Sequence, residues 1–261
     1  MDPLPVSLKE SDRVEVLTLM DNFVDVLLED TKVVSRPPKA IGTEIPTDTL
    51  LAEHGLSLLV KVQHGAEKHT ILFDTGYNSM GVLHNMAKLA VDPNEMEAIV
   101  LSHAHMDHTG SLHPILQKIS TPIPLVVHPD AFLYPRFVEE KDGSRKRFPR
   151  TLVRTDLDRR NVELLESKTP TPILDETILV TGEVERTTEF EKGMPNALIE
   201  RDGNLEPDPI KDDQALVMHL KNKGLVVVPM HCTGRKAMEQ FSREFPSSFV
   251  LNSVGSKITL N

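Results

Sequence analysis

A chain of 261 residues with 39% hydrophobic residues fits one layered α/β domain, a type that often reaches about 250 residues. The formal net charge of −10 at pH 7 would repel a phosphate backbone, and 4% aromatic residues without Trp offer few platforms for stacked bases, which argues against nucleic acid as a partner. The only cysteine is Cys232, so an intrachain disulfide and a zinc site of paired cysteines are excluded.

The N-terminal third alternates strand and helix patterns. Residues 14–20 are predicted to form a strand, and the apolar segment 24–28 and a loop rich in Pro and charge at 31–46 follow it. The strands at 56–63 and 70–73 are predicted to form a hairpin. Residues 78–89 have helical spacing, and 97–101 form another apolar strand.

The remaining elements follow the same pattern. Helices are predicted at 112–119 and 236–245, and strands at 124–127, 178–181, 215–220 and 225–228. Between them lies a charged excursion at 131–160, which is either a solvated loop or a lid that offers cations to an anionic substrate. Hairpins separated by helices predict a layered α/β sandwich.

The strand at 97–101 runs directly into a dense group of metal-ligand residue types. His103, His105 and Asp107 would share one face of an extended chain, and a turn that begins at Met106 would bring His108 back to them. Imidazole and carboxylate suit Zn, Mn or Fe, and so dense a cluster can divide its ligands between two adjacent ions. The sequence therefore predicts a metal centre at the end of this strand.

Segments in several parts of the chain resemble the metallo-β-lactamase superfamily. Residues 102–110 (Ser-His-Ala-His-Met-Asp-His-Thr-Gly) resemble its HxHxDH signature, and residues 73–76 (Phe-Asp-Thr-Gly) resemble its preceding aspartate motif. Further agreement lies at 52–59, 212–216 and 231–234, which together look like the branch of dihydropterin-phosphate synthase-like proteins. The resemblance covers most of the chain.

This resemblance implies a single domain over residues 1–261, an αββα four-layer sandwich with metal at one edge of two facing sheets. It implies one or two divalent metal ions, Zn first, with Mn or Fe as alternatives. The implied ligands are His103, His105, Asp107, His108, Asp213 and His231. Asp74 is expected to orient a ligating imidazole as a hydrogen-bond acceptor.

The choice of Asp213 over Asp212 depends on position, because Asp213 leads directly into the strand at 215–220. If 215–220 and 225–230 form a hairpin about the turn at 221–224, Asp213 faces His231 or Cys232. Cys232 itself is either a small buried residue or a competing soft ligand.

Many members of the superfamily carry a further histidine between the HxHxDH segment and the bridging aspartate. In this chain the strand end at that place carries Glu183 instead. Glu183 is a candidate to replace this ligand. The alternatives are that the second metal-binding position lacks a ligand or that His128 supplies it. Asn22 and His54 match positions typical of the branch and are candidates for the substrate pocket.

The implied chemistry is hydrolysis of a small ester, lactone or phosphoester by a metal-bound hydroxide, with Asp107 as the catalytic proton acceptor. Two alternatives stay open: a dihydropterin-phosphate synthase-like condensation and a di-iron redox or sensor protein on the same fold. The start of the chain has no signal-peptide pattern, and no apolar run approaches the ~18 residues of a membrane span. We therefore expect a cytoplasmic protein that acts on a small molecule, for which an anionic group is one option.

Overall fold

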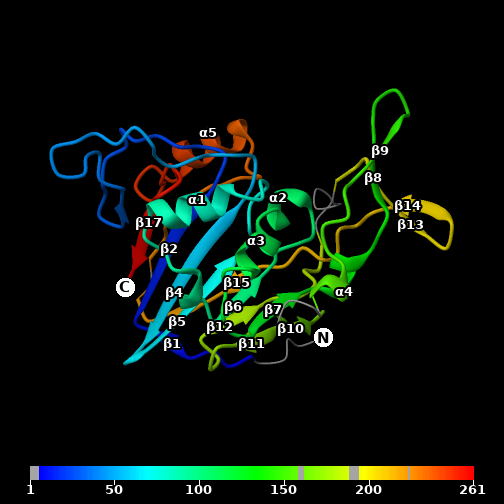
Figure 1. Ribbon diagram of the computed structural model, residues 1–261, viewed down its shortest axis with the longest axis horizontal. Helices are drawn as coiled ribbons and strands as arrows, with labels where there is room; N and C mark the ends of the chain where they lie inside the picture. The colour runs from blue at the N-terminus through cyan, green and yellow to red at the C-terminus, as the bar shows by residue number, and fades with distance from the viewer. Residues whose placement is uncertain (1–5, 158–161, 188–193, 223) are drawn as a thin grey trace.

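A computed structural model describes residues 6–157, 162–187, 194–222 and 224–261 (Figure 1). Among these residues, the centre is an eight-stranded sheet of order β10-β7-β6-β5-β4-β2-β17-β3. Its strands in chain order are β2 (Arg13–Met20), β3 (Val34–Ser35), β4 (Ser57–His64), β5 (Glu67–Phe73), β6 (Ala98–Val100), β7 (Ile123–Val127), β10 (Val162–Glu166) and β17 (Lys257–Leu260).

The direction of the strands places the site. β4 and β5 form the predicted hairpin, in which Gly65 takes the positive φ that the tight turn needs. β5, β6 and β7 are parallel, and β6 is buried along its whole length, as expected for a strand covered on both faces. Their C-terminal ends therefore meet at one edge, where Asp74, Ser102 and His128 follow β5, β6 and β7.

Helices pack on one face of this sheet and a second sheet packs on the other. The helical face carries α1 (Gly81–Lys88), α2 (Met106–Thr109) and α3 (Leu112–Leu116), which lie side by side in front of the strands in Figure 1. The other face contacts β11 (Thr171–Ile173), β12 (Ile178–Val180) and β15 (Leu216–Val217) through a separate apolar core that includes Val60, Ile71 and Val180. The predicted α/β sandwich is confirmed.

Short elements complete the described chain. They are β1 (Glu10–Ser11), β16 (His219–Leu220), α4 (Arg154–Leu157), α5 (Arg235–Glu244) and the 3-10 helices η1 (Pro93–Glu95) and η2 (Pro129–Phe132). None of the helices in the described ranges has the length and apolarity that a membrane crossing requires.

The charged excursion folds into a small sheet of its own. β8 (Arg136–Glu139) and β9 (Arg145–Arg147) join β13 (Ala197–Arg201) and β14 (Asn204–Pro207) in the order β14-β13-β8-β9. This sheet projects from the body of the molecule at the right of Figure 1. Residues 158–160 of the excursion lie outside the described residues.

The predicted hairpin between 215–220 and 225–230 is wrong. β15 pairs with β12 and β16 pairs with β1, whereas Val227 exchanges backbone hydrogen bonds with the segment around Phe249. The two segments thus find partners far away in the chain, and the predicted strand at 225–228 is reduced to one isolated bridge. Residue 223 of the predicted turn lies outside the described residues.

Candidate metal centre

The loop after β6 gathers the imidazoles as predicted. His105 is still extended, and α2 begins at Met106, which turns the chain so that His108 comes back. The ring of His103 lies 4.6 Å from that of His105 and 4.1 Å from that of His108, centroid to centroid. Gly110 is required after this turn, because a Cβ there would lie 1.8 Å from the carbonyl oxygen of Tyr77.

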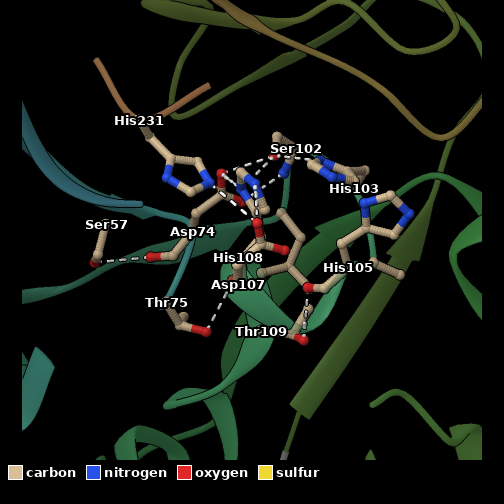
Figure 2. A network of polar contacts seen from close by, with 12 residues as sticks. Ser57, Asp74, Thr75, Ser102, His103, His105, Asp107, His108, Thr109 and His231 are labelled. Atoms are coloured by element: carbon tan, nitrogen blue, oxygen red, sulfur yellow. Dashed lines mark hydrogen bonds and ion pairs between the residues drawn. The ribbon is translucent and has the colours of Figure 1, made fainter. Parts of the chain in front are cut away.

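Asp74 is hydrogen-bonded to this loop (Figure 2). Its buried carboxylate accepts hydrogen bonds from the backbone N–H and the hydroxyl of Ser102, each at 2.7 Å, and from Nδ1 of His108 at 2.7 Å. His108 therefore carries its proton on Nδ1, and its Nε2 is buried without a hydrogen bond to any described residue. A carboxylate that fixes one ring nitrogen and leaves the other free is the usual support of a metal-binding histidine.

Two other imidazoles are held in the same way. Ser102 gives its hydroxyl proton to Asp74, and its oxygen lies 3.0 Å from Nδ1 of His103, from which it can accept. The amide of Asn22 brackets His231, because its oxygen lies 2.9 Å from Nδ1 and its nitrogen donates to the His231 carbonyl at 2.8 Å. Asn22 thus orients a histidine, and it is absent from the described lining of the cavity.

Asp107 lies among the remaining ring nitrogens. Its Oδ2 is 3.1 Å from Nε2 of His231, 3.6 Å from Nε2 of His54 and 3.9 Å from Nε2 of His108. The His54 side chain is 70% exposed, so this residue lies at the mouth of the site. Potential ligand atoms of His108, His231 and Cys232 also lie within 4.8 Å of one another, which brings the soft thiol into the same group.

The ionisable groups of the site shift one another's pKa values. Burial, followed by the neighbouring imidazoles, holds the pKa of His103 well below its usual value, and burial with Arg136 lowers the pKa of His105. Burial alone would lower the pKa of His108 and His231 as well, but Asp74 raises that of His108 to about 10, and hydrogen bonds with Asp107 and Cys232 raise that of His231 to about 9. Two of the four imidazoles thus favour the neutral form, and the two that contact Asp74 or Asp107 favour the protonated form.

Asp212 and Asp213 have different environments. Asp212 is fully buried, and its carboxylate accepts from the guanidinium of Arg136 at 2.8 Å and from the backbone N–H of Ala104 at 3.0 Å. Arg136 also pairs with Asp208 at 3.1 Å. The Asp213 side chain is 58% exposed and pairs with Arg186 at 3.4 Å. Its oxygens are therefore more available to a metal ion than those of Asp212.

A cavity of about 750 Å³ opens over these groups. Its lining includes His103, His105, His108, Asp213 and His231, and so it unites five of the six expected ligands. The sixth, Asp107, reaches the group through His231. An apolar wall is added by Leu56, Phe73, Val184, Met194, Ile210 and Met230, and Arg186 adds a cation.

Glu183 is not among the described residues that line this cavity. Its carboxylate pairs with Lys211 at 3.0 Å and lies 3.9 Å from Nε2 of the buried His128. The structure thus places Glu183 and His128 together at the end of β7, as a pair beside the main histidine cluster.

Sequence reasoning missed the supports contributed by Ser102 and by the excursion. Ser102 is the first residue of the segment 102–110, so its position next to His103 could have indicated a supporting role. Arg136 and Phe148 carried no such sequence signal, because their roles depend on tertiary contacts. Arg136 binds Asp212, and the ring of Phe148 stacks on that of His105 with 5.0 Å between the centroids. Thr151 adds a hydrogen bond to the Ala104 carbonyl at 3.0 Å. The small sheet is therefore attached to the ligand loop.

Two facing sheets with a histidine and aspartate cluster at the C-terminal edge of parallel strands define an α/β sandwich with a candidate metal centre. The family model of the metallo-beta-lactamase superfamily matches residues 52–197. The chain belongs to this superfamily.

Individual relatives agree with this assignment. The chain is 31% identical over 180 residues to the 7,8-dihydropterin-6-methyl-4-(beta-D-ribofuranosyl)-aminobenzene-5'-phosphate synthase of Methanocaldococcus jannaschii, covering 68% of this chain and 60% of that protein. It is 26% identical over 255 residues to an uncharacterized protein of the same organism, covering 79% and 93%. The crystal structure of a metal-dependent hydrolase of the beta-lactamase superfamily matches with a TM-score of 0.63 at 20% identity, covering 95% and 98%.

The donor set fits the divalent metals that this superfamily typically binds. It offers neutral imidazole nitrogens, carboxylate oxygens and one thiol, and one imidazole nitrogen is buried without a hydrogen bond in the described chain. The predicted fold of the metallo-β-lactamase type is confirmed, and so is the resemblance to the dihydropterin-phosphate synthase branch.

Proposed function

We propose that the chain is a metal-dependent enzyme whose metal centre is formed by His103, His105, Asp107, His108, Asp213 and His231. The observation that carries the proposal is the state of His108. Its Nδ1 proton is committed to Asp74, and its buried Nε2 faces Asp107 and His231 without a hydrogen bond to a described group. A buried polar atom left unpaired is costly unless it has a partner in the working state.

Divalent cations bound there would polarise a substrate oxygen and lower the pKa of a coordinated water. The protein contributes proton handling through Asp107. Burial would raise the pKa of this carboxyl, but the hydrogen bond from His231 and the charge of His108 outweigh burial and lower it below its usual range. Asp107 is therefore ionised, and it contacts His231, which lines the cavity. In this state its carboxylate can orient a water molecule and accept a proton from it.

The cavity favours a small substrate with both apolar and anionic parts. Val184, Met194 and Ile210 supply apolar surface, and the Arg186 guanidinium supplies positive charge beside Asp213. We propose hydrolysis of a small ester, lactone or phosphoester as the reaction. A phosphoester would use Arg186 most fully, because guanidinium groups bind phosphate with charge-assisted hydrogen bonds.

A condensation is the second candidate, and the 31% identical synthase favours it. By analogy with the product in that protein's name, the amino nitrogen of a ribosyl-aminobenzene phosphate would form a bond to the 6-methyl carbon of a dihydropterin. A leaving group on that carbon would depart with the bonding electrons, and the nitrogen would lose a proton. The same cations and Arg186 would then act on the leaving group and the phosphate.

Asp107→Asn tests the proposed role of Asp107. We expect the variant to keep most of its metal, measured by elemental analysis, and to lose about 10²-fold or more in turnover, as for a lost proton acceptor. Asp142→Asn, on the distant β8–β9 turn, is the control. Substrates are p-nitrophenyl phosphates, phosphodiesters and lactones for hydrolysis, and the pterin and aminobenzene pair for condensation.

The two reactions give different results in this assay. If a product that joins the pterin and aminobenzene substrates forms and the test esters are not hydrolysed, the reaction is condensation and not hydrolysis. Unchanged turnover of Asp107→Asn in whichever reaction is found would remove Asp107 from the mechanism.

A further inference from the structure

A second group of ligand-type side chains lies near the opposite end of β5 from Asp74. Glu67 and His69 are two residues apart on this strand and so share one face. Asp175, from the turn between β11 and β12, comes alongside them. One potential ligand atom from each residue lies within 4.8 Å of the other two.

His69 is prepared as a ligand in the same way as His108. The residue is 8% exposed, and its Nδ1 lies 3.0 Å from Oε2 of Glu97. The other oxygen of Glu97 accepts the backbone N–H of Thr70 at 2.9 Å, which fixes this carboxylate. Donation from Nδ1 to Glu97 leaves a lone pair on Nε2, and this buried nitrogen has no hydrogen bond among the described residues.

The spacing on the Nε2 side suits a cation. Nε2 is 3.8 Å from Oδ2 of Asp175, which is too far for a hydrogen bond. An ion about 2.0–2.2 Å from a nitrogen and an oxygen would hold these atoms roughly 3–4 Å apart. The side chains of Glu67 and Asp175 are 55% and 67% exposed, so water can complete the coordination.

We propose that Glu67, His69 and Asp175 form a second divalent-cation site, of the zinc type, which is separate from the metal centre. It would connect the eight-stranded sheet to the β11–β12 turn and thus stabilise the contact between the two sheets. Lys9 is its competitor, because its ammonium lies 3.9 Å from Oε2 of Glu67. The site does not depend on the proposed function.

Zinc binding to the full chain tests the site. We expect His103→Ala with His105→Ala to remove the ions of the metal centre but to leave one Zn²⁺ per chain in equilibrium dialysis. Adding Asp175→Asn should remove this last ion and the rise in melting temperature that Zn²⁺ produces. Glu67→Gln should weaken binding, whereas Glu163→Gln, an exposed carboxylate on β10, should bind as the parent does.

Lys9→Gln provides the opposite change. Removing the competing ammonium should tighten Zn²⁺ binding if the three residues hold a cation. All these substitutions except the His103 and His105 pair are at exposed or half-buried positions, so folding is preserved. If Asp175→Asn and Glu67→Gln retain the parent's zinc stoichiometry and thermal response, the group is only a cluster of polar side chains, and the proposal is overturned.

Discussion

His108 and His128 both lie at the C-terminal edge of the parallel strands, but Nδ1 of the first donates a hydrogen bond whereas Nδ1 of the second accepts one. Nδ1 of His108 donates to Asp74 at 2.7 Å, so Nε2 is the nitrogen from which a cation would displace the second proton of this ring. Nδ1 of His128 instead accepts the backbone N–H of Asp130 at 3.1 Å. Since burial lowers the pKa of His128 and keeps it neutral, its proton must be on Nε2, which faces Glu183.

This difference separates a histidine that can bind metal from one that cannot without rotating. A neutral imidazole binds metal only through the nitrogen that carries no proton. The two histidines are similarly buried, so burial and residue type do not distinguish them. The hydrogen-bond partner of Nδ1 does, and it places the metal centre on the His108 side.

The largest expected effect comes from removing two ligands on the His108 side. His103→Ala with His105→Ala should abolish metal at the centre and all activity, because the loop after β6 then offers only Asp107 and His108. Circular dichroism should show a folded chain, since the sheets do not depend on these side chains. Full metal content in elemental analysis, after correction for the zinc proposed at His69, would contradict the account.

Asp74→Asn should weaken metal binding about 10–100-fold, the usual effect of losing the group that orients a ligating histidine. An amide in this position cannot stabilise the Nδ1 proton of His108 as a carboxylate does. The measurement is competition with a chromophoric chelator. Asp130→Asn is the matched control, because His128 contacts the backbone of Asp130 and not its carboxylate; equal weakening in both variants would remove the distinction between the two histidines.

The next effect is on the reactivity of Cys232 in the metal-free chain. The neighbouring imidazoles of His108 and His231 lower the pKa of this thiol from 9.0 to about 7. A lowered pKa means that the thiolate is present above about pH 7, so alkylation by iodoacetamide should be half-maximal near that pH. His108→Gln should move the midpoint upward; a midpoint that stays near 7 would show that His108 does not act on the thiol.

The smallest effect is expected for Glu183→Gln. The hypothesis of a ligand at Glu183 requires the metal content to fall from about two ions per chain to about one. Because Glu183 pairs with Lys211 and faces a protonated His128 nitrogen, we expect unchanged stoichiometry and zinc preference instead. Glu185→Gln serves as the neighbour control. Loss of one ion in Glu183→Gln alone would restore Glu183 as a ligand.

The sequence predicted the parts of the fold and site that local signals determine. The alternation of β4 and β5 around Gly65 gave the hairpin, and the order of residues from His103 to His108 gave the ligand loop and the turn at Met106. The motif also placed Asp74 before the histidines along the chain, and the structure brings its carboxylate to Nδ1 of His108.

The rest depends on contacts between distant segments. The pairing of β8 with β13 joins residues about sixty positions apart. The two strands are not connected by a tight turn, so no turn sequence predicts their pairing. The segment around Val227 was apolar enough for a hairpin strand but pairs near Phe249 instead. Arg136 and Asn22 gain their roles only when Asp212 and His231 come to them, so their identity alone could not reveal those roles.

We infer above all that a divalent metal binds within the cluster of His103, His105, Asp107, His108 and His231. The most direct measurement is anomalous diffraction at the zinc edge from crystals grown with Zn²⁺. We predict a peak within coordination distance, about 2.0–2.2 Å, of Nε2 of His108 or His231, with Nδ1 of His108 still hydrogen-bonded to Asp74. A fully occupied zinc peak beside His128 and Glu183, with none at His108 and His231, would contradict it.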